Sequence, residues 1–252
     1  NFRSYTRAGI SPQGRSPIVV LTGENGAGKT NVLEALSYLA PGRGLRRATI
    51  GDVARQGATS PWAVAATLDL AGESVKVGTG QDVGGNDAGT RRLVRVDGQS
   101  AANSNVLGDR WAVTWLTPQM DRLFTEGPAS RRRFLDRLVL GLYADHSRQV
   151  GAYERVMRER NRLMNDKGHR ADPAWLSAIE ARMAEHAVAV ATARLDYAGQ
   201  LAGQLAEAED GPFPKAELAI DGWLEGLLAD GMAAVEAEAA YRDKLMTGRA
   251  RD

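Results

Sequence analysis

The sequence predicts an α/β protein in two parts, a lobe of strands and helices over residues 1–125 and a mostly α-helical arm over residues 126–252. Three observations support this prediction. An apolar stretch, a glycine-rich loop and a helical pattern follow one another near the start of the chain. Alternating apolar and polar residues then indicate antiparallel strands. Beyond Pro118, long amphipathic patterns indicate helices.

The lobe begins with two segments that predict strands. Residues 2–8 fit the middle of an edge strand, and residues 17–22 form a short apolar run, rich in β-branched side chains, that predicts a buried strand. After residues 23–30 a helix is predicted up to Pro41, because apolar side chains recur at three- and four-residue steps. These side chains are Val32, Leu33, Leu36 and Leu39.

Two further segments of the lobe are expected to be extended. Residues 62–97 alternate apolar and polar side chains between glycine turns, which predicts a small antiparallel side sheet. Residues 111–118 form a second apolar run and predict another buried strand. A parallel sheet covered by helices needs several buried strands, and only these two candidates are found. We therefore expect the α/β lobe to be incomplete and both ends of the sequence to belong to a longer chain.

The arm is predicted to be an antiparallel pair of helices over residues 145–167 and 173–208. Asp172 and Pro173 are typical of an N-cap followed by a first-turn proline. Apolar residues at near-heptad spacing are expected to form the seam between the two helices. They are Leu176, Ile179, Met183, Val190, Tyr197, Leu201 and Leu205. A strand near residues 216–220 and a helix ending near Leu245 are predicted to follow.

Composition and charge exclude several classes of protein. The sequence has no cysteine, so it has no disulfides and no thiolate metal site, which fits a cytoplasmic location. No apolar run has the length of a membrane span, and the start lacks the layout of a signal peptide. Residues 122–170 carry a net charge of +6 and residues 180–252 one of −7. The acidic outer face predicted for the long helix would repel DNA and suit a basic protein surface. Its members are Glu180, Glu185, Asp196, Glu207 and Glu209.

Residues 23–30 match the phosphate-binding pattern G-x-x-x-x-G-K-T, between a predicted strand and a predicted helix. Glycines let several backbone amides turn inward at the positive end of the helix, where an anion is stabilised. Lys29 is expected to reach the β and γ phosphates of ATP, and the Thr30 hydroxyl to bind Mg²⁺. The candidate nucleotide-binding residues are Gly23, Glu24, Asn25, Gly26, Ala27, Gly28, Lys29, Thr30 and Asn31.

Hydrolysis of ATP needs more than this loop, because a carboxylate must hold Mg²⁺ and another group must orient water. No run of four apolar residues followed by Asp-Glu occurs in the sequence. Gln119, directly after the second predicted buried strand, could contact Mg²⁺ or water, and an ordinary polar loop residue is the alternative. Lys29 and Gln119 are therefore the candidate catalytic residues, and Thr30 and Gln119 the candidate metal ligands.

Five segments together resemble the RecF family of bacterial DNA replication and repair ATPases, relatives of SMC and Rad50 proteins within the ABC class. The segments are residues 1–5, 23–35, 42–47, 117–118 with 131–136, and 153–163. Many NTPases share the glycine loop. Its combination with Arg-Arg-Arg-Phe-Leu-Asp at 131–136 and Arg-Asn-Arg-Leu at 160–163 is specific to this family, and the resemblance spans nearly the whole chain.

The resemblance implies an ABC-type P-loop lobe with an antiparallel β subdomain, and a helical arm. It also implies a cytoplasmic protein that binds ATP and Mg²⁺, forms an ATP-dependent homodimer and binds DNA at single-strand gaps and junctions. The same resemblance implies roles in recombinational repair, replication restart and the SOS response to DNA damage. It also implies mediator partners such as RecR. Family members continue through a serine-glycine signature and an Asp-Glu strand that this sequence lacks, and position 119 is often Glu. A weak ATPase of the full-length dimer is therefore expected.

Three arginines after the predicted nucleotide helix are the candidate DNA ligands, because SMC-like relatives have DNA-sensing arginines there. They are Arg43, Arg46 and Arg47. We expect them to bind the DNA backbone, with little sequence preference and a steep salt dependence.

The run of arginines at 131–133 spans nearly a full helical turn, so one helix face cannot present all three to DNA. A solvated face is the alternative to DNA contact. Two other functions stay open: a structural SMC/Rad50-like ATPase, and a small-molecule P-loop phosphotransferase.

Overall fold

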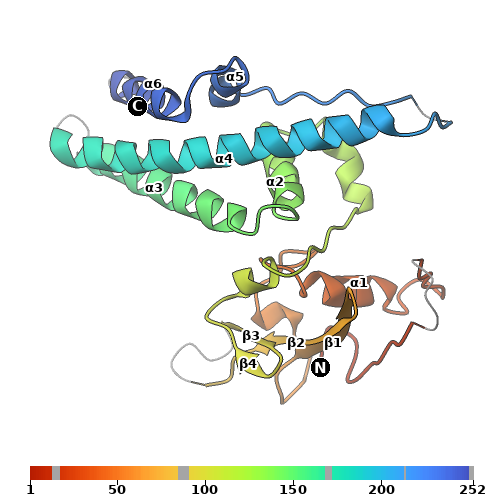
Figure 1. The fold of residues 1–252 in the computed structure, drawn as a ribbon. Coiled ribbons are helices and arrows are strands. Elements are labelled where there is room, and N and C mark those ends of the chain that lie inside the picture. Colours follow the sequence, from red (N-terminus) through yellow and green to blue (C-terminus); the bar gives the residue numbers. More distant parts are fainter. Residues whose placement is uncertain (13–17, 85–90, 168–171, 213, 250–252) are drawn as a thin grey trace. The chain divides into compact units, whose positions relative to one another are not determined.

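The computed structural model describes the chain apart from residues 13–17, 85–90, 168–171, 213 and 250–252 (Figure 1). The chain divides into two compact units, Asn1–Met120 and Asp121–Asp252. In the part of the chain that is described, no helix is both long and apolar enough to cross a lipid bilayer.

A four-stranded antiparallel sheet, in the order β1-β2-β3-β4, forms the centre of the first unit. Its strands are β1 (Ala63–Leu70), β2 (Glu73–Gln81), β3 (Arg92–Val96) and β4 (Gln99–Ser100). Ala71 and Gly72 form the two-residue turn between β1 and β2, with φ angles of 54° and 92°. Positive φ at both positions gives a turn whose twist matches that of a hairpin. The antiparallel sheet predicted from the alternation in residues 62–97 is therefore confirmed.

The first unit has two hydrophobic clusters. In the first, the rings of Phe2 and Tyr38 pack on Trp62, with centroids 5.6 and 5.1 Å from that of Trp62. The second lies against the sheet and contains Leu39, Val77, Val94 and Leu107. Since Tyr38 and Leu39 directly follow α1 (Lys29–Ser37), the end of this helix is anchored in both clusters. Short 3₁₀ turns complete the elements: η1 (Gly51–Val53), η2 (Ser104–Leu107) and η3 (Pro118–Arg122).

Three strands predicted for the lobe are not formed. Residues 18–22 and 111–117 have no regular secondary structure, while residue 17 lies outside the described residues. Ile18, Val20 and Leu116 are 73%, 75% and 79% exposed. A buried strand needs a paired neighbour and a covering layer, and among the described residues the only sheet is the antiparallel one. Residues 2–5 form a tight turn with reciprocal backbone hydrogen bonds of 2.9 Å, instead of an edge strand.

The second unit is helical, as the sequence predicts. Its described helices are α2 (Pro128–Val139), α3 (His146–Lys167), α4 (Pro173–Glu207), α5 (Trp223–Ala229) and α6 (Ala234–Gly248). The predicted N-cap is also confirmed, because the Asp172 carboxylate accepts a hydrogen bond of 2.9 Å from the Ala174 amide. The strand predicted near residues 216–220 is wrong: this segment is irregular and mostly exposed, with no described strand beside it.

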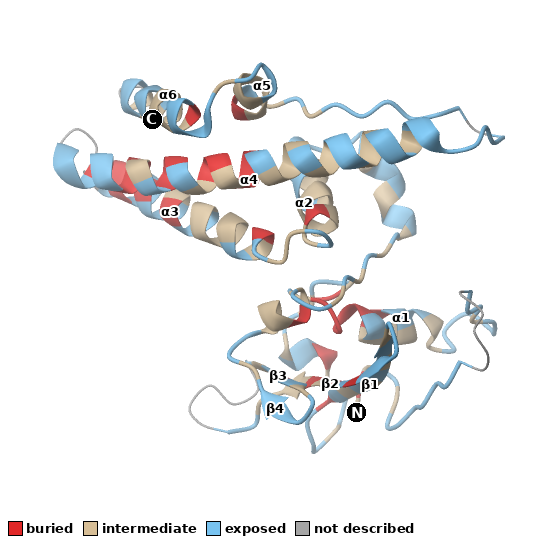
Figure 2. Cartoon of the chain, in the orientation of Figure 1, coloured by how far each residue is buried: buried red, intermediate tan, exposed pale blue. Residues whose placement is uncertain are grey.

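The long helices α3 and α4 lie side by side and bury the sides that face each other, which confirms the predicted hairpin (Figures 1 and 2). The buried seam consists of Val156, Leu163, Met164, Leu176, Ile179 and Met183. A second cluster joins α4 to α5 and α6 through Ala187, Val188, Ala191, Leu224 and Ala237. The arm is therefore thicker than a two-helix hairpin, since α5 and α6 also pack on α4.

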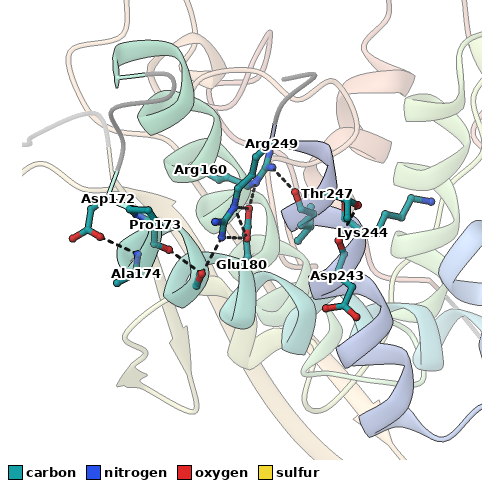
Figure 3. A network of polar contacts seen from close by, with 11 residues as sticks. Arg160, Asp172, Pro173, Ala174, Glu180, Asp243, Lys244, Thr247 and Arg249 are labelled. Atoms are coloured by element: carbon teal, nitrogen blue, oxygen red, sulfur yellow. Dashed lines mark hydrogen bonds and ion pairs between the residues drawn. The ribbon is translucent and has the colours of Figure 1, made fainter.

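The acidic outer face predicted for α4 is wrong in one member, Glu180. This residue is only 2% exposed and accepts hydrogen bonds from Arg160 and Arg249 (Figure 3). Arg249 directly follows α6, whose Tyr241 and Leu245 pack against the buried seam of α3 and α4. The other predicted members of the face are exposed, namely Glu185, Asp196, Glu207 and Glu209.

Candidate nucleotide-binding site

The glycine loop leads directly into α1 in the first unit. Gly28 is the N-cap residue, with a φ of 96°, and α1 begins at Lys29. Residues 22–27 are exposed. Because the N-cap has no side chain, no side chain caps the first turn, and a ligand can reach the amides at the positive end of the helix dipole. This arrangement suits an anion such as a phosphate.

Tyr5 packs tightly against the loop. Its hydroxyl donates to the Ala27 carbonyl at 3.3 Å. A Cβ atom added to Gly28 would lie 2.5 Å from this hydroxyl. Together with its positive φ, the close approach of Tyr5 requires glycine at position 28. The sequence motif predicts a glycine here, but not the aromatic residue that supports the loop.

Lys29 lies within the loop rather than pointing away from it. Its ammonium group donates to the carbonyl oxygens of Gly23 and Glu24 at 2.7 and 2.8 Å. These two hydrogen bonds fix the Lys29 ammonium group beside the loop in which the phosphates would bind. A polyphosphate would then meet both the helix amides and a fixed cation.

The two predicted metal ligands lie in different elements of the first unit, Thr30 in α1 and Gln119 in η3. Thr30 is exposed in the first turn of α1, where its hydroxyl fits one position around Mg²⁺. Gln119 is exposed in η3, and within the described residues no hydrogen bond or ion pair joins it to the glycine loop. No group of three or more His, Cys, Asp or Glu that could hold a metal occurs among the described residues. The described residues therefore suit Mg²⁺ binding only when a bound polyphosphate supplies further oxygen ligands.

Behind the loop, α1 carries a buried carboxylate that the sequence pattern does not reveal. The Glu34 side chain is 0% exposed and forms ion pairs with Arg3 and Arg46. The hydrogen bond to Glu34 raises the pKa of Arg3 above its ordinary value, although partial burial opposes this shift. Arg46 also donates to the side chain of Asn31 at 2.9 Å. A candidate DNA ligand is thus tied to the helix of the candidate nucleotide site.

The three candidate DNA ligands lie on the loop after α1, and all three are exposed: Arg43, Arg46 and Arg47. Arg92 of β3 holds the start of this loop by donating to the carbonyls of Tyr38, Ala40 and Gly42, the last two at 3.2 and 2.7 Å. Burial lowers the pKa of Arg92 to about 10.

Comparison with known proteins supports the resemblance seen in the sequence. A model of the AAA domain family matches residues 1–87. The chain is 46% identical over 253 residues to the DNA replication and repair protein RecF of Rhizobium meliloti (strain 1021), covering 100% of the chain and 66% of that protein. The chain belongs to the RecF family. The RecF of Rhizobium rhizogenes (strain K84) is 45% identical over 253 residues, and the chain covers 65% of it. The chain thus spans slightly less than two thirds of these RecF relatives.

Solved RecF structures share the fold. The recombination mediator protein RecF-ATPrS of the RecFOR pathway matches with a TM-score of 0.70 and 16% identity, covering 91% of this chain and 61% of that one. RecF-ATP of the same pathway matches with a TM-score of 0.63 and 19% identity, over 73% of this chain and 48% of that one. The predicted α/β class, with a P-loop lobe, antiparallel β subdomain and helical second part, is confirmed.

Proposed function

We propose that this RecF-family chain is the nucleotide-binding part of a cytoplasmic DNA replication and repair protein that binds DNA under the control of ATP. The observation that carries this proposal is the open glycine loop at the head of α1, with the Lys29 ammonium held inside it. The RecF relatives, named for DNA replication and repair, supply the biological context.

The nucleotide proposed is ATP with Mg²⁺. The loop amides and Lys29 would hold the phosphates, and Thr30 would supply one oxygen ligand to the metal ion, which neutralises phosphate charge. The sequence contains no apolar strand that ends in Asp-Glu, so the carboxylates that hold Mg²⁺ and polarise water are not among its residues. We therefore expect this chain to bind ATP with negligible turnover. The full-length protein would be a weak ATPase as an ATP-dependent homodimer.

The nucleic acid proposed is DNA at single-strand gaps and junctions, in recombinational repair, replication restart and SOS induction. Exposed arginines beside α1 support backbone contact, because guanidinium groups pair with phosphate oxygens irrespective of sequence. Mediator proteins such as RecR are the proposed protein partners.

Fluorescence anisotropy with labelled DNA tests this function. Gapped, fully paired and single-stranded DNA of several sequences would be titrated with the chain, with and without ATP and Mg²⁺, between about 50 and 200 mM salt. We expect similar affinity for different sequences, tighter binding to gapped DNA, and a steep fall with salt. Replacing Arg43 or Arg47 by alanine should reduce the salt slope by about one.

Arg182→Ala is the matched control, since this arginine is exposed on α4 within the acidic part of the chain and should leave DNA affinity unchanged. Affinity that does not respond to salt, or that is unaffected by both loop substitutions, would contradict the proposed DNA contact.

A further inference from the structure

Glu34 is a buried carboxylate shared by two arginines from separate segments. Arg3 donates through Nε to Oε2 at 2.8 Å and through Nη2 to Oε1, so it grips both oxygens. Arg46 donates through Nη1 to Oε2 at 2.7 Å. One negative charge therefore faces two positive charges, and the three side chains carry a net charge of +1.

The two arginines are held very differently. The Arg3 side chain is 19% exposed and uses its remaining nitrogen, Nη1, on the Asp52 carbonyl at 2.7 Å. The Arg46 side chain is 41% exposed, and a single nitrogen, Nη1, donates its hydrogen bonds to the Glu34 and Asn31 side chains. If Arg46 moved away, the two-point pair of Arg3 with Glu34 would remain, so no buried charge would lose its partner. A departure of Arg3 would instead break the two-point grip on a desolvated carboxylate, which is costly.

We propose that Glu34 is a positioning residue that holds Arg46 in readiness for a phosphate group, and that Arg46 leaves Glu34 when the phosphate arrives. This inference rests on the proposed function, which supplies two sources of phosphate: the DNA backbone and the tail of the nucleotide. The excess positive charge of the cluster is the charge that a phosphate would neutralise.

The cluster also links the arginine loop to the nucleotide helix. Asn31, which follows Thr30, accepts from Arg46 at 2.9 Å and donates to the Ser4 hydroxyl at 2.8 Å. Release of Arg46 would remove one of these two ties on Asn31. Any effect of bound phosphate at Arg46 on nucleotide affinity must be matched by an equal effect of nucleotide on phosphate affinity.

The first test measures DNA affinity after the charge that holds Arg46 is removed. Glu34→Gln keeps the shape of the side chain, and we expect DNA to bind roughly fivefold more tightly because Arg46 is no longer paired. The gain should vanish in the double variant Glu34→Gln with Arg46→Ala. Mere structural damage would weaken binding and would not depend on Arg46. The inference is overturned if neither DNA nor inorganic tripolyphosphate binds more tightly to a folded Glu34→Gln protein, or if a gain survives the loss of Arg46.

Asn31→Ala provides a second route if Glu34→Gln fails to fold. It removes the other acceptor of Arg46 and leaves the buried pair of Arg3 and Glu34 intact. We expect a smaller gain in DNA affinity, roughly threefold, that again requires Arg46. An Asn31→Ala protein with no gain in affinity for either DNA or tripolyphosphate, or with a gain independent of Arg46, would contradict the proposal.

NMR of the arginine side-chain nitrogens separates this inference from the proposed function. The ¹⁵N signals of Arg3 and Arg46 would be followed while inorganic tripolyphosphate or duplex DNA is added. We expect the Arg46 signal to shift and the Arg3 signal to stay. A shift with tripolyphosphate alone would assign the phosphate to the nucleotide and remove the DNA contact. DNA binding with no shift of Arg46 in either titration would overturn the role of Glu34 while leaving the proposed function in place.

Discussion

The Arg160 guanidinium of α3 donates to the Glu180 carboxylate of α4 at 3.0 Å, and both side chains are almost fully buried (Figure 3). Arg249, just beyond α6, pairs with the same carboxylate. The charged group therefore joins three helices of the second unit at one point. A buried carboxylate can be tolerated here because two guanidinium groups satisfy its oxygens.

Removing this carboxylate should destabilise the second unit. Glu180→Ala removes the buried carboxylate that the Arg160 and Arg249 guanidinium groups share, which we expect to cost about 3–5 kcal/mol of unfolding free energy. Urea unfolding followed by circular dichroism measures the loss. Glu185→Ala is the control, because this residue is exposed on the same helix, and its effect should stay within about 0.5 kcal/mol. Equal stability of the two variants would show that the buried pair contributes nothing.

Acid should weaken the same unit through Asp136. Burial alone would raise the pKa of this carboxyl, but hydrogen bonds from His146 of α3 and Arg194 of α4 outweigh burial and hold its pKa below the ordinary value. Arg194 in turn pairs with Glu225 of α5. A carboxyl with a depressed folded-state pKa adds stability above its unfolded pKa, near 3.8, and this stability is lost as pH falls through the folded pKa.

Asp136→Asn tests this pH dependence. The stability difference between the wild type and Asp136→Asn should be constant from neutral pH down to about 5 and should shrink below about 4. Thermal unfolding at a series of pH values gives this difference. A stability difference that grows toward low pH would contradict a lowered pKa of Asp136.

Arg92 should control the order of the loop that follows α1. Its guanidinium donates to carbonyls of three residues between positions 38 and 42, which a single lysine ammonium cannot match. We expect Arg92→Lys to destabilise the first unit by about 1–3 kcal/mol and to speed hydrogen exchange over residues 38–44. Arg95→Lys, at an exposed position of the same strand, is the control. Unchanged exchange in Arg92→Lys would refute the anchoring role.

The Tyr5 contact predicts that even a methyl group at position 28 disturbs the loop. In Gly28→Ala the new Cβ would lie 2.5 Å from the Tyr5 hydroxyl, on a backbone with a φ of 96°. We expect ATP affinity to fall about tenfold, since strain of one to two kcal/mol must be absorbed by the loop. Gly9→Ala is the control, because no atom lies within 4 Å of its Cβ position. Nucleotide titration compares the two. Wild-type affinity in Gly28→Ala would contradict the account of Tyr5.

Local patterns in the sequence predict the hairpins and long helices well. The alternation in residues 62–97 and the heptad spacing from Leu176 depend on neighbours within a few residues, so short-range periodicity suffices. The apolar run of residues 18–22 shows the limit, because a strand also needs a paired neighbour, which the run itself does not specify. Its side chains are instead largely exposed.

Among the site residues, too, some follow from local sequence patterns and others depend on long-range contacts. The glycine loop is found from its motif, whereas the burial of Glu34 and Glu180 depends on arginines far away in the sequence. Arg3 lies 31 residues from Glu34, and Arg249 lies 69 residues from Glu180. An acidic residue on the polar face of a helix is predicted to have a solvated side chain. Only the packed structure shows which acidic side chains are buried. Tyr5 and Arg92 also act through long-range contacts that no local pattern indicates.

The nucleotide affinity of the chain tests the central claim most directly. Isothermal titration calorimetry would compare ATP binding in the presence of Mg²⁺ by the wild type, Lys29→Ala and Lys76→Ala, the last an exposed lysine on β2. We expect the wild type and Lys76→Ala to bind ATP equally and Lys29→Ala to bind at least about tenfold more weakly, because the phosphates lose a charged hydrogen bond. No ATP binding by the wild type, or equal binding by all three proteins, would contradict the assignment of the glycine loop as the nucleotide site.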